Sequence, residues 1–130
     1  MKLGVSSYSF TKHIKQTGAT YRDVCKLAKE IGYEGIEFTD LDLAVQPARD
    51  LNALADDIRA YCQEIGLTII AYTVGADFIG GGAGEVNKVK AKVDIAARLG
   101  AKVMRHDAAW KLPDGMTWRD AVNIIAGPIR

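Results

Sequence analysis

The stretch LAKEIGYEGIEFTD, at residues 27–40, decides the fold because its pattern recurs along the chain. An apolar segment with helical spacing runs into a glycine, and a short run rich in β-branched and aromatic residues follows. The pattern returns as YCQEIGLTIIAYTV at residues 61–74 and as IAARLGAKVMRHDA at residues 95–108. The three glycines, at positions 32, 66 and 100, are 34 residues apart. A regular period of this size indicates a repeated structural unit.

The two halves of the repeat predict different secondary structure. Before each glycine, apolar residues recur every three or four positions, as in Val24, Leu27 and Ile31, which is typical of a helix with one buried face. After each glycine come only five to eight residues rich in Ile, Val, Phe and Tyr. This run is too short for the second helix of a helix–turn–helix array, so we predict buried strands. Alternating strands and helices of this kind form a parallel sheet covered by helices.

Length and composition fit a single domain over residues 1–130 with 48% hydrophobic residues and a net charge of +1. Charged residues are scattered, so we expect neither nucleic acid nor a membrane as a partner. Apolar runs are shorter than a membrane span, and the first residues lead into a strand and not a signal peptide, so we expect a cytoplasmic protein. Cys25 and Cys62 fall within helical patterns, and we expect both to be reduced thiols.

Capping and turn residues give the expected boundaries of the elements. Thr20 with Asp23, and Thr117 with Asp120, have the spacing of helix N-terminal caps. The glycine-rich segment 75–84 is either a mobile loop that covers a substrate or a plain connector. We predict loops at residues 11–19 and 40–48, the second packed on the protein. The predicted strands are residues 3–10, 35–39, 67–74 and 102–107, and the predicted helices are residues 20–31, 49–65, 85–99 and a segment after residue 117.

Four strand–helix units favour one half of a (β/α)₈ barrel, a parallel (β/α)₄ arrangement of the α/β class, because the closed barrel needs eight units and about 250 residues. The competing fold is a Rossmann-like, doubly wound sheet that binds a nucleotide. That fold carries a glycine fingerprint after its first strand, and the first predicted turn here, SFTK at residues 9–12, lacks it. The half barrel is therefore the preferred prediction.

The segments KLGVSSYSF, LAKEIGYEGIEFTD, LTIIAYTV and AARLGAKVMR resemble, in order and spacing, the first half of the xylose isomerase-like TIM barrels, the sugar phosphate isomerase/epimerase family. IGYEGIEF is the most specific of these pieces. The resemblance implies an isomerase or epimerase that moves a proton next to the carbonyl or hydroxyl of a ketose or related sugar, with two glutamates as acid and base. It also implies a divalent metal (Mn, Mg, Co or Zn) at the mouth of the full-length barrel.

In that family the metal ligands lie on strands five to eight, and the first of them follows the fourth helix. We therefore expect no metal, no cofactor and no catalytic residue within these 130 residues, and no activity from this chain alone. What the chain is expected to supply is substrate contacts.

Glu37 and Arg105 are the first candidates for such contacts. Each stands five residues after its junction glycine, so both should lie on the same face near the carboxyl ends of their strands. In a barrel that position is the mouth, where both side chains could contact a sugar or sugar phosphate. The alternative is a structural ion pair between them, because a charge held in a core has to be paired.

His106 and Asp107 are adjacent, so in a strand they should face opposite sides. His106 has three interpretations: substrate contact, a structural hydrogen bond, or a metal ligand as in the related barrel AP endonucleases. A second metal-binding histidine of those enzymes has no counterpart on the third strand, which reads Tyr72, Thr73 and Val74.

Further substrate contacts are predicted for Trp110, Ser6 and Tyr8. Related ketose epimerases hold a tryptophan over the sugar after the fourth strand, and the alternative for Trp110 is that it covers its own core. Ser6 and Tyr8 end the first predicted strand, and core packing is the alternative for Tyr8. His13 is expected to be solvated.

A second hypothesis concerns assembly. Four parallel strands leave two unpaired edges, so two half barrels could pair, first strand to fourth, and close a symmetric homo-oligomer without catalysis.

Overall fold

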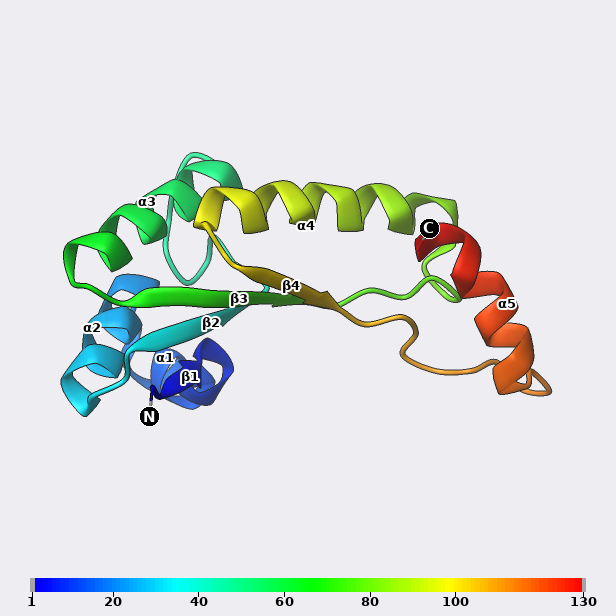
Figure 1. The fold of residues 1–130 in the computed structure, drawn as a ribbon, viewed down its shortest axis with the longest axis horizontal. Coiled ribbons are helices and arrows are strands. Elements are labelled where there is room, and N and C mark those ends of the chain that lie inside the picture. Colours follow the sequence, from blue (N-terminus) through cyan, green and yellow to red (C-terminus); the bar gives the residue numbers. More distant parts are fainter. Residues whose placement is uncertain (1, 130) are drawn as a thin grey trace.

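The computed structural model describes residues 2–129 and contains one parallel sheet in the order β1-β2-β3-β4 (Figure 1). This α/β half-barrel arrangement is the predicted one. The strands are β1 (Gly4–Ser6), β2 (Gly35–Thr39), β3 (Thr68–Val74) and β4 (Val103–His106). The α-helices are α1 (Thr11–Thr17), α2 (Tyr21–Ile31), α3 (Leu51–Glu64), α4 (Glu85–Leu99) and α5 (Trp118–Ile129), and the 3₁₀ turns are η1 (Ser7–Phe10) and η2 (Gly82–Gly84).

The three repeated glycines are the helix ends that the period predicts. Gly32, Gly66 and Gly100 have φ angles of 108°, 67° and 70°. This left-handed conformation suits glycine because it has no Cβ. The amide nitrogens of the next residues bond back to the preceding helices, as from Tyr33 to the oxygen of Ala28 at 3.0 Å. Each glycine thus turns the chain from a helix into the following strand.

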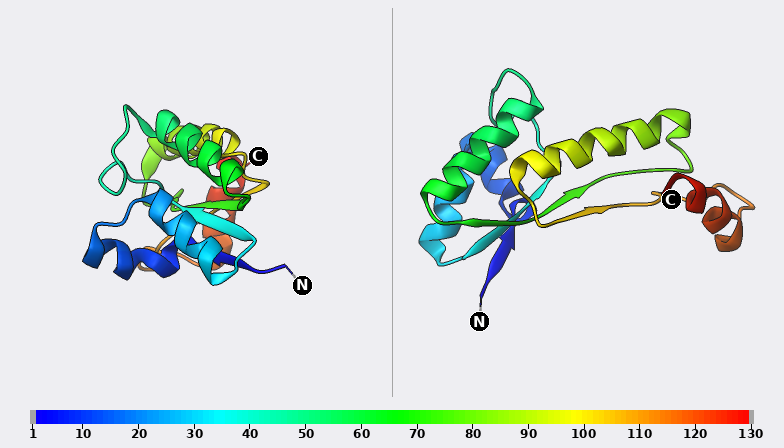
Figure 2. Two further views of the ribbon diagram at one scale, coloured as in Figure 1. Left: turned by 90° about the vertical axis from the view of Figure 1, so that its left-hand side faces the viewer. Right: turned by 45° about the horizontal axis from the view of Figure 1, so that its top comes forward.

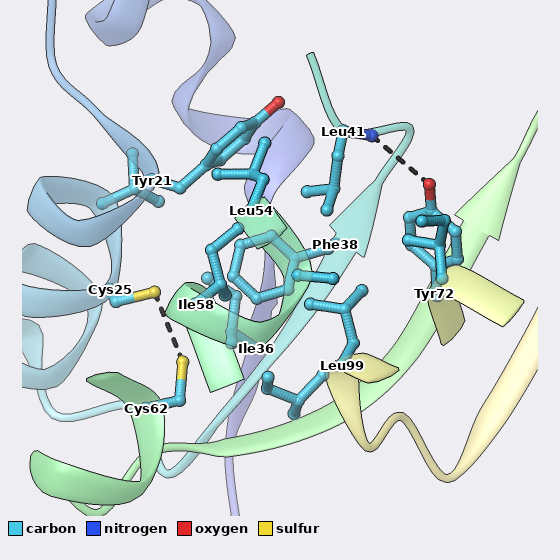
Figure 3. Packing of buried hydrophobic residues seen from close by; sticks show 14 of the residues in the cluster. Tyr21, Cys25, Ile36, Phe38, Leu41, Leu54, Ile58, Cys62, Tyr72 and Leu99 are labelled. Atoms are coloured by element: carbon cyan, nitrogen blue, oxygen red, sulfur yellow. Dashed lines mark hydrogen bonds between the residues drawn. The ribbon is translucent and has the colours of Figure 1, made fainter. Parts of the chain in front are cut away.

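Helices α2, α3 and α4 cover one face of the sheet, which we call the helix face (Figures 1 and 2). Alternate strand residues point into this layer, and Ile36, Phe38 and Tyr72 are completely buried in it. Leu54 and Ile58 of α3 belong to the same buried cluster and lie next to Ile36 and Phe38 (Figure 3). The core of the described chain therefore lies between the sheet and these helices.

The first strand is shorter than predicted, and the segment after it is helical. We predicted a strand over residues 3–10 and a loop over residues 11–19, and both predictions are wrong. The chain leaves the sheet after Ser6 because the Ser6 hydroxyl oxygen accepts from the Tyr8 amide at 3.3 Å and starts η1. The Ser7 hydroxyl oxygen then accepts from the Thr39 amide at 3.0 Å, taking the place of a strand carbonyl. Helix α1 follows and ends at Gly18.

The other boundaries agree closely with the sequence. Strand β2 and helix α4 have the predicted ends, and α2 begins with the predicted capping box of Thr20 and Asp23. Helix α3 starts two residues later than predicted because the Asp50 carboxylate accepts from the Ala53 amide at 2.8 Å and caps it. The loop 40–48 packs on the protein as expected, with Leu41 only 5% exposed.

Helix α5 lies apart from the layer formed by α2, α3 and α4 (Figures 1 and 2). Its last turn, with Pro128 and Ile129, meets Val86 and Val89 near the start of α4 around a pocket of about 130 Å³. Trp118 on its first turn is 75% exposed. Among residues 2–129, none of the helices combines the length and apolar character that a membrane crossing requires.

Candidate functional site

The carboxyl ends of the strands meet at one edge of the sheet and carry a group of polar side chains. The register places Ser6 beside Glu37, and two residues further along the strands it aligns Thr39, Thr73 and Arg105. These residues alternate with the buried ones, so they lie on the face opposite α2, α3 and α4, which we call the open face. Glu37 and Arg105 therefore share a face, as their equal offsets predicted.

Glu37 is tied to the neighbouring strand. The Thr73 hydroxyl donates a short hydrogen bond to Glu37 Oε1, and both side chains are only partly buried. A strand hydroxyl beside a carboxylate can donate to or accept from a polyhydroxylated molecule. The pair is thus a fixed hydrogen-bonding point near the carboxyl end of the sheet.

Arg105 does not pair with Glu37, so the predicted alternative of a structural ion pair between them is wrong. Its Nη2 atom lies 3.0 Å from Asp107 Oδ1, and the Arg105 side chain is 67% exposed. Asp107 directly follows β4, and this contact places its carboxylate beside the Arg105 guanidinium. An exposed guanidinium in an ion pair of this kind is weakly held, so it is free to meet an anionic group.

His106 points to the opposite side from Arg105, as adjacent strand residues must. Its ring meets Phe78 edge-on, with centroids 5.6 Å apart, in the small pocket that Val86 and Val89 of α4 also line. Its Nδ1 atom lies 2.7 Å from the Asp107 carbonyl oxygen, which is the structural hydrogen bond among the three interpretations. The structure brings His106 together with the helix layer and not with the open face, and its contact with substrate stays a prediction.

Trp110 stands over the end of β3. Its ring lies so close to Gly75 that a Cβ at position 75 would be 2.8 Å from Cζ2 of the indole. With 72% of its surface exposed, Trp110 does not cover the core, which was the alternative. The Gly75 amide donates to Asp40 Oδ2 at 3.0 Å, and Lys92 of α4 pairs with the other oxygen of Asp40. Asp40 thereby joins the ends of β2 and β3 to the middle of α4.

Ser6 and Tyr8, the two candidates at the end of β1, differ from each other in burial. Ser6 is partly buried beside Glu37, and its hydroxyl is used in capping η1. Tyr8 is 72% exposed next to α1, so the alternative of core packing for Tyr8 is wrong. Its predicted contact with substrate stays a prediction. His13 is exposed, as expected, although it lies in α1 and not in a loop.

The glycine-rich segment 75–84 is held in place by two acidic side chains. Asp77 Oδ1 accepts from the amides of Ile79 and Gly80 at 3.1 and 2.8 Å, and Glu85 Oε1 accepts from the Asp77 amide at 2.8 Å. The Asp77 amide keeps the pKa of Glu85 below its ordinary value, because that bond favours the ionised carboxylate. The Phe78 amide bonds to the Ala108 carbonyl at 3.0 Å. These bonds fasten the segment to α4 and to the chain after β4.

Sequence reasoning missed three residues of this edge: Ser7, Asp40 and Thr73. The role of Ser7 was not predicted because we expected residue 7 to lie in a strand. Asp40 directly follows a predicted strand, and the rule that parallel strands end at a common edge could have found it. Thr73 could have been found only from the pairing of β2 with β3, which sets the register against Glu37.

The residues at this edge do not fit a divalent metal. Within residues 2–129, no three His, Cys, Asp or Glu side chains come close enough to hold one. The carboxylates of Glu37, Asp40 and Asp107 are each engaged by a different partner. A site for Mn, Mg, Co or Zn needs several ligands around one point. We therefore derive no chemical step through a metal from these residues.

Comparison with known proteins agrees with the architecture. A search of curated protein sequences finds no match to this chain. The sequence pattern of the xylose isomerase-like TIM barrel matches residues 25–126, a span that runs from α2 into α5 and covers three of the four strands. Together with the parallel sheet and the repeated glycine ends, this match shows that the chain belongs to the xylose isomerase-like TIM barrel family.

Proposed function

We propose that the carboxyl edge of the open face binds a small sugar or sugar phosphate in a protein of the sugar isomerase/epimerase type. The family match supports the general type of function. The observation that supports the location is the Glu37–Thr73 hydrogen-bonded pair with the exposed Arg105 on the same face. At this edge the Glu37 carboxylate, the Thr73 hydroxyl and the Arg105 guanidinium lie on neighbouring strands, no more than two residues apart in register.

Each of these groups suits one part of such a ligand. The Glu37 carboxylate accepts from sugar hydroxyls, and the Thr73 hydroxyl can do so once it turns toward the ligand. The Arg105 guanidinium offers a fork of donors that matches a phosphate, and it would exchange Asp107 for that phosphate. The exposed ring of Trp110 can lie against the apolar face of a sugar.

Binding is the whole of the proposed role for the described residues. They hold no group of metal ligands, and the proposal assigns no acid–base pair to them. The isomerase or epimerase reaction would then need residues and a metal that these do not provide. We expect the chain of 130 residues to bind without turnover.

Calorimetry with a ketose and with the same ketose carrying a phosphate tests the binding site. We expect the phosphorylated sugar to bind more tightly, and Arg105→Gln to weaken that binding by at least about tenfold while leaving the plain sugar unaffected. Lys111→Gln removes the same charge from an exposed position of the following segment and is the matched control. Binding of neither sugar at millimolar concentration, or equal effects of the two variants, would contradict the proposed site.

An activity assay tests the absence of turnover separately. The chain is incubated with manganese and a panel of ketoses and ketose phosphates, and the products are followed by chromatography. We expect no conversion above that of manganese alone. Metal-dependent conversion by the purified chain would show that residues described here do form a metal site.

A specific observation also favours a second role, in which two copies of the chain pair. Two apolar side chains of the open face, Ile70 and Val103, are 37% and 62% exposed. Within the described residues, β1 and β4 each have one neighbour in the sheet. A half-turn about the barrel axis would place β4 of one copy beside β1 of the other in the parallel sense, and the two sheets would close around these side chains.

Sedimentation of the chain tests this pairing. We expect a dimer at micromolar concentration, and a shift toward monomer for Val103→Lys. Ile31→Lys introduces the same charge at a similarly exposed apolar residue at the end of α2, away from the open face, and should leave the dimer intact. A stable monomer, a larger aggregate, or equal effects of the two variants would each count against the pairing.

A further inference from the structure

Two cysteines from different helices meet inside the core. Cys25 of α2 and Cys62 of α3 are 0% and 1% exposed, and their Sγ atoms are 3.5 Å apart, within hydrogen-bond distance for thiols (Figure 3). They are 37 residues apart in the sequence. The fold therefore brings together two thiols that the sequence keeps on separate helices.

The geometry is close to that of a disulfide. A disulfide bond is about 2.0 Å long, so the two sulfur atoms need to approach by about 1.5 Å. Small rotations about the Cα–Cβ bonds move a sulfur atom that far without moving a helix axis. The two thiols are already directed at each other, as their hydrogen bond shows.

One of the two cysteines borders a surface depression. Cys62 contributes to the lining of a groove of about 360 Å³ between α3 and the start of β3, together with Arg59 and Lys102. Cys25 does not line this groove, and its hydrogen bond with Cys62, together with burial, raises the pKa of its thiol. Cys62 is therefore the better first nucleophile of the two.

We propose that Cys25 and Cys62 form an oxidisable dithiol site, in which a small peroxide converts the pair into a disulfide that links α2 to α3. The Cys62 thiolate attacks one oxygen of hydrogen peroxide, the O–O bond breaks, and hydroxide leaves and takes up a proton to become water. Cys62 is then a sulfenic acid. The Cys25 thiolate attacks that sulfur, forms the S–S bond and releases a second hydroxide, which is also protonated. The two thiols are oxidised by two electrons, and one peroxide is reduced to two molecules of water.

Mass spectrometry of the folded chain after treatment with hydrogen peroxide tests this site. We expect the wild-type chain to lose the mass of two hydrogen atoms, to resist alkylation after denaturation, and to yield a peptide that joins residues 25 and 62. A thiol reductant should reverse all three changes. The link should also raise the midpoint of thermal unfolding by roughly 5–10 °C, because it closes a long loop in the unfolded chain.

Single variants test the order of the two steps. In Cys25→Ser the sulfenic acid on Cys62 has no thiol to attack it, so we expect it to accumulate and to be trapped by a cyclic diketone. In Cys62→Ser the remaining thiol should oxidise at least about tenfold more slowly, because Cys25 does not border the groove. Circular dichroism shows whether each variant is folded, and the alanine versions replace any serine variant that is not.

Three results would overturn the proposal. The first is that peroxide leaves both thiols of the folded wild-type chain open to alkylation. The second is that oxidation joins two chains and not residues 25 and 62 of one chain. The third is that the link forms only in denaturant, because the folded arrangement would then play no part in it. The wild-type experiment is decisive without any variant.

Discussion

The two faces of the sheet are made by alternate residues of the same strands, yet they differ in how far their side chains are buried. On the helix face, Ile36, Phe38 and Tyr72 are completely buried under α2, α3 and α4. On the open face, Glu37 is bonded to Thr73 at the carboxyl end, while Ile70 and Val103 are partly exposed. One face is complete within the described residues, whereas the other presents side chains toward solvent.

This difference separates the face that stabilises the fold from the face at which we propose that a ligand binds. Burial of large apolar side chains is the main source of folding free energy, so the helix face should carry most of the stability. Polar groups on the open face contribute little to stability and stay available for a ligand. The comparison predicts that neighbouring residues along one strand will have very different effects when they are changed.

The largest expected effect is on the helix face at Phe38. Phe38→Ala removes a fully buried ring and should lower the free energy of unfolding by about 3–5 kcal/mol. Glu37→Gln, one residue earlier on the open face, keeps the size of the side chain and should cost less than about 1 kcal/mol. Urea unfolding followed by circular dichroism measures both. Similar losses for the two variants would show that the open face is part of the core.

The capping box of α2 should have the next largest effect, because α2 covers the helix face only when it is folded. The Thr20 hydroxyl holds the pKa of Asp23 below its ordinary value of 3.8. Because the pKa of Asp23 is lowered in the folded protein, the stabilisation by the cap is fully present above the ordinary value of 3.8. It is lost as the pH falls below 3.8 and Asp23 becomes protonated in the folded protein. Thr20→Ala should cost about 1 kcal/mol near neutral pH.

Repeating the same unfolding measurement along a series of acidic pH values checks the linkage. The difference between wild type and Thr20→Ala should shrink as Asp23 becomes protonated. Ser9→Ala removes an exposed hydroxyl within η1 and is the control for a loss of polarity alone. A difference that stays constant down to low pH would mean that the cap does not act through Asp23.

Tyr72 allows a smaller test of the same face. Its hydroxyl oxygen accepts from the Leu41 amide at 3.4 Å, and burial raises its pKa to about 12. Because the folded pKa is raised, this stabilisation is present below the ordinary value of 10.0 and is lost as the pH rises toward about 12. Tyr72→Phe should cost about 0.5–1.5 kcal/mol near neutral pH and should reduce the loss of stability in alkali. Tyr61→Phe leaves the bond between Leu41 and Tyr72 intact and is the control. If it reduced the loss of stability in alkali as much as Tyr72→Phe, Tyr72 would not be the source of that loss.

The smallest effect is expected on the open face at Val103. At a dilution where sedimentation shows a monomer, Val103→Lys should change the free energy of unfolding by no more than about 0.5 kcal/mol, because the side chain is 62% exposed. Thermal unfolding at that dilution measures the change. A clear loss in the monomer would mean that the open face is covered by the chain itself.

Much of this architecture was predictable because it depends on local patterns. The repeated glycines marked three helix ends, and the apolar spacing marked α2, α3 and α4. The failure was at the start of the chain, where alternating residues predicted a strand to residue 10. There the Ser6 and Ser7 hydroxyls bond to backbone amides and end the strand early. Side chains that compete with the backbone in this way are hard to recognise from spacing alone.

The candidate site was predictable in part for the same reason. Glu37 and Arg105 were placed on one face by counting from their glycines, since strand residues alternate with a fixed period. Their partners were not predictable, because Thr73 and Asp107 depend on strand register and on side-chain rotamers. His106 shows the same limit: its position on the strand was expected, but its contact with Phe78 comes from the loop before α4.

The sequence by itself therefore determined the units: where helices end, where strands begin, and which strand residues alternate. These features depend on backbone conformation and on the spacing of apolar residues, both of which are properties of short segments. Only the tertiary structure decided which groups meet, including the Glu37 and Thr73 side chains, the Asp40 carboxylate and the Gly75 amide, and the thiols of Cys25 and Cys62. Such contacts join segments more than thirty residues apart, and their geometry is set by the packing of whole elements against one another.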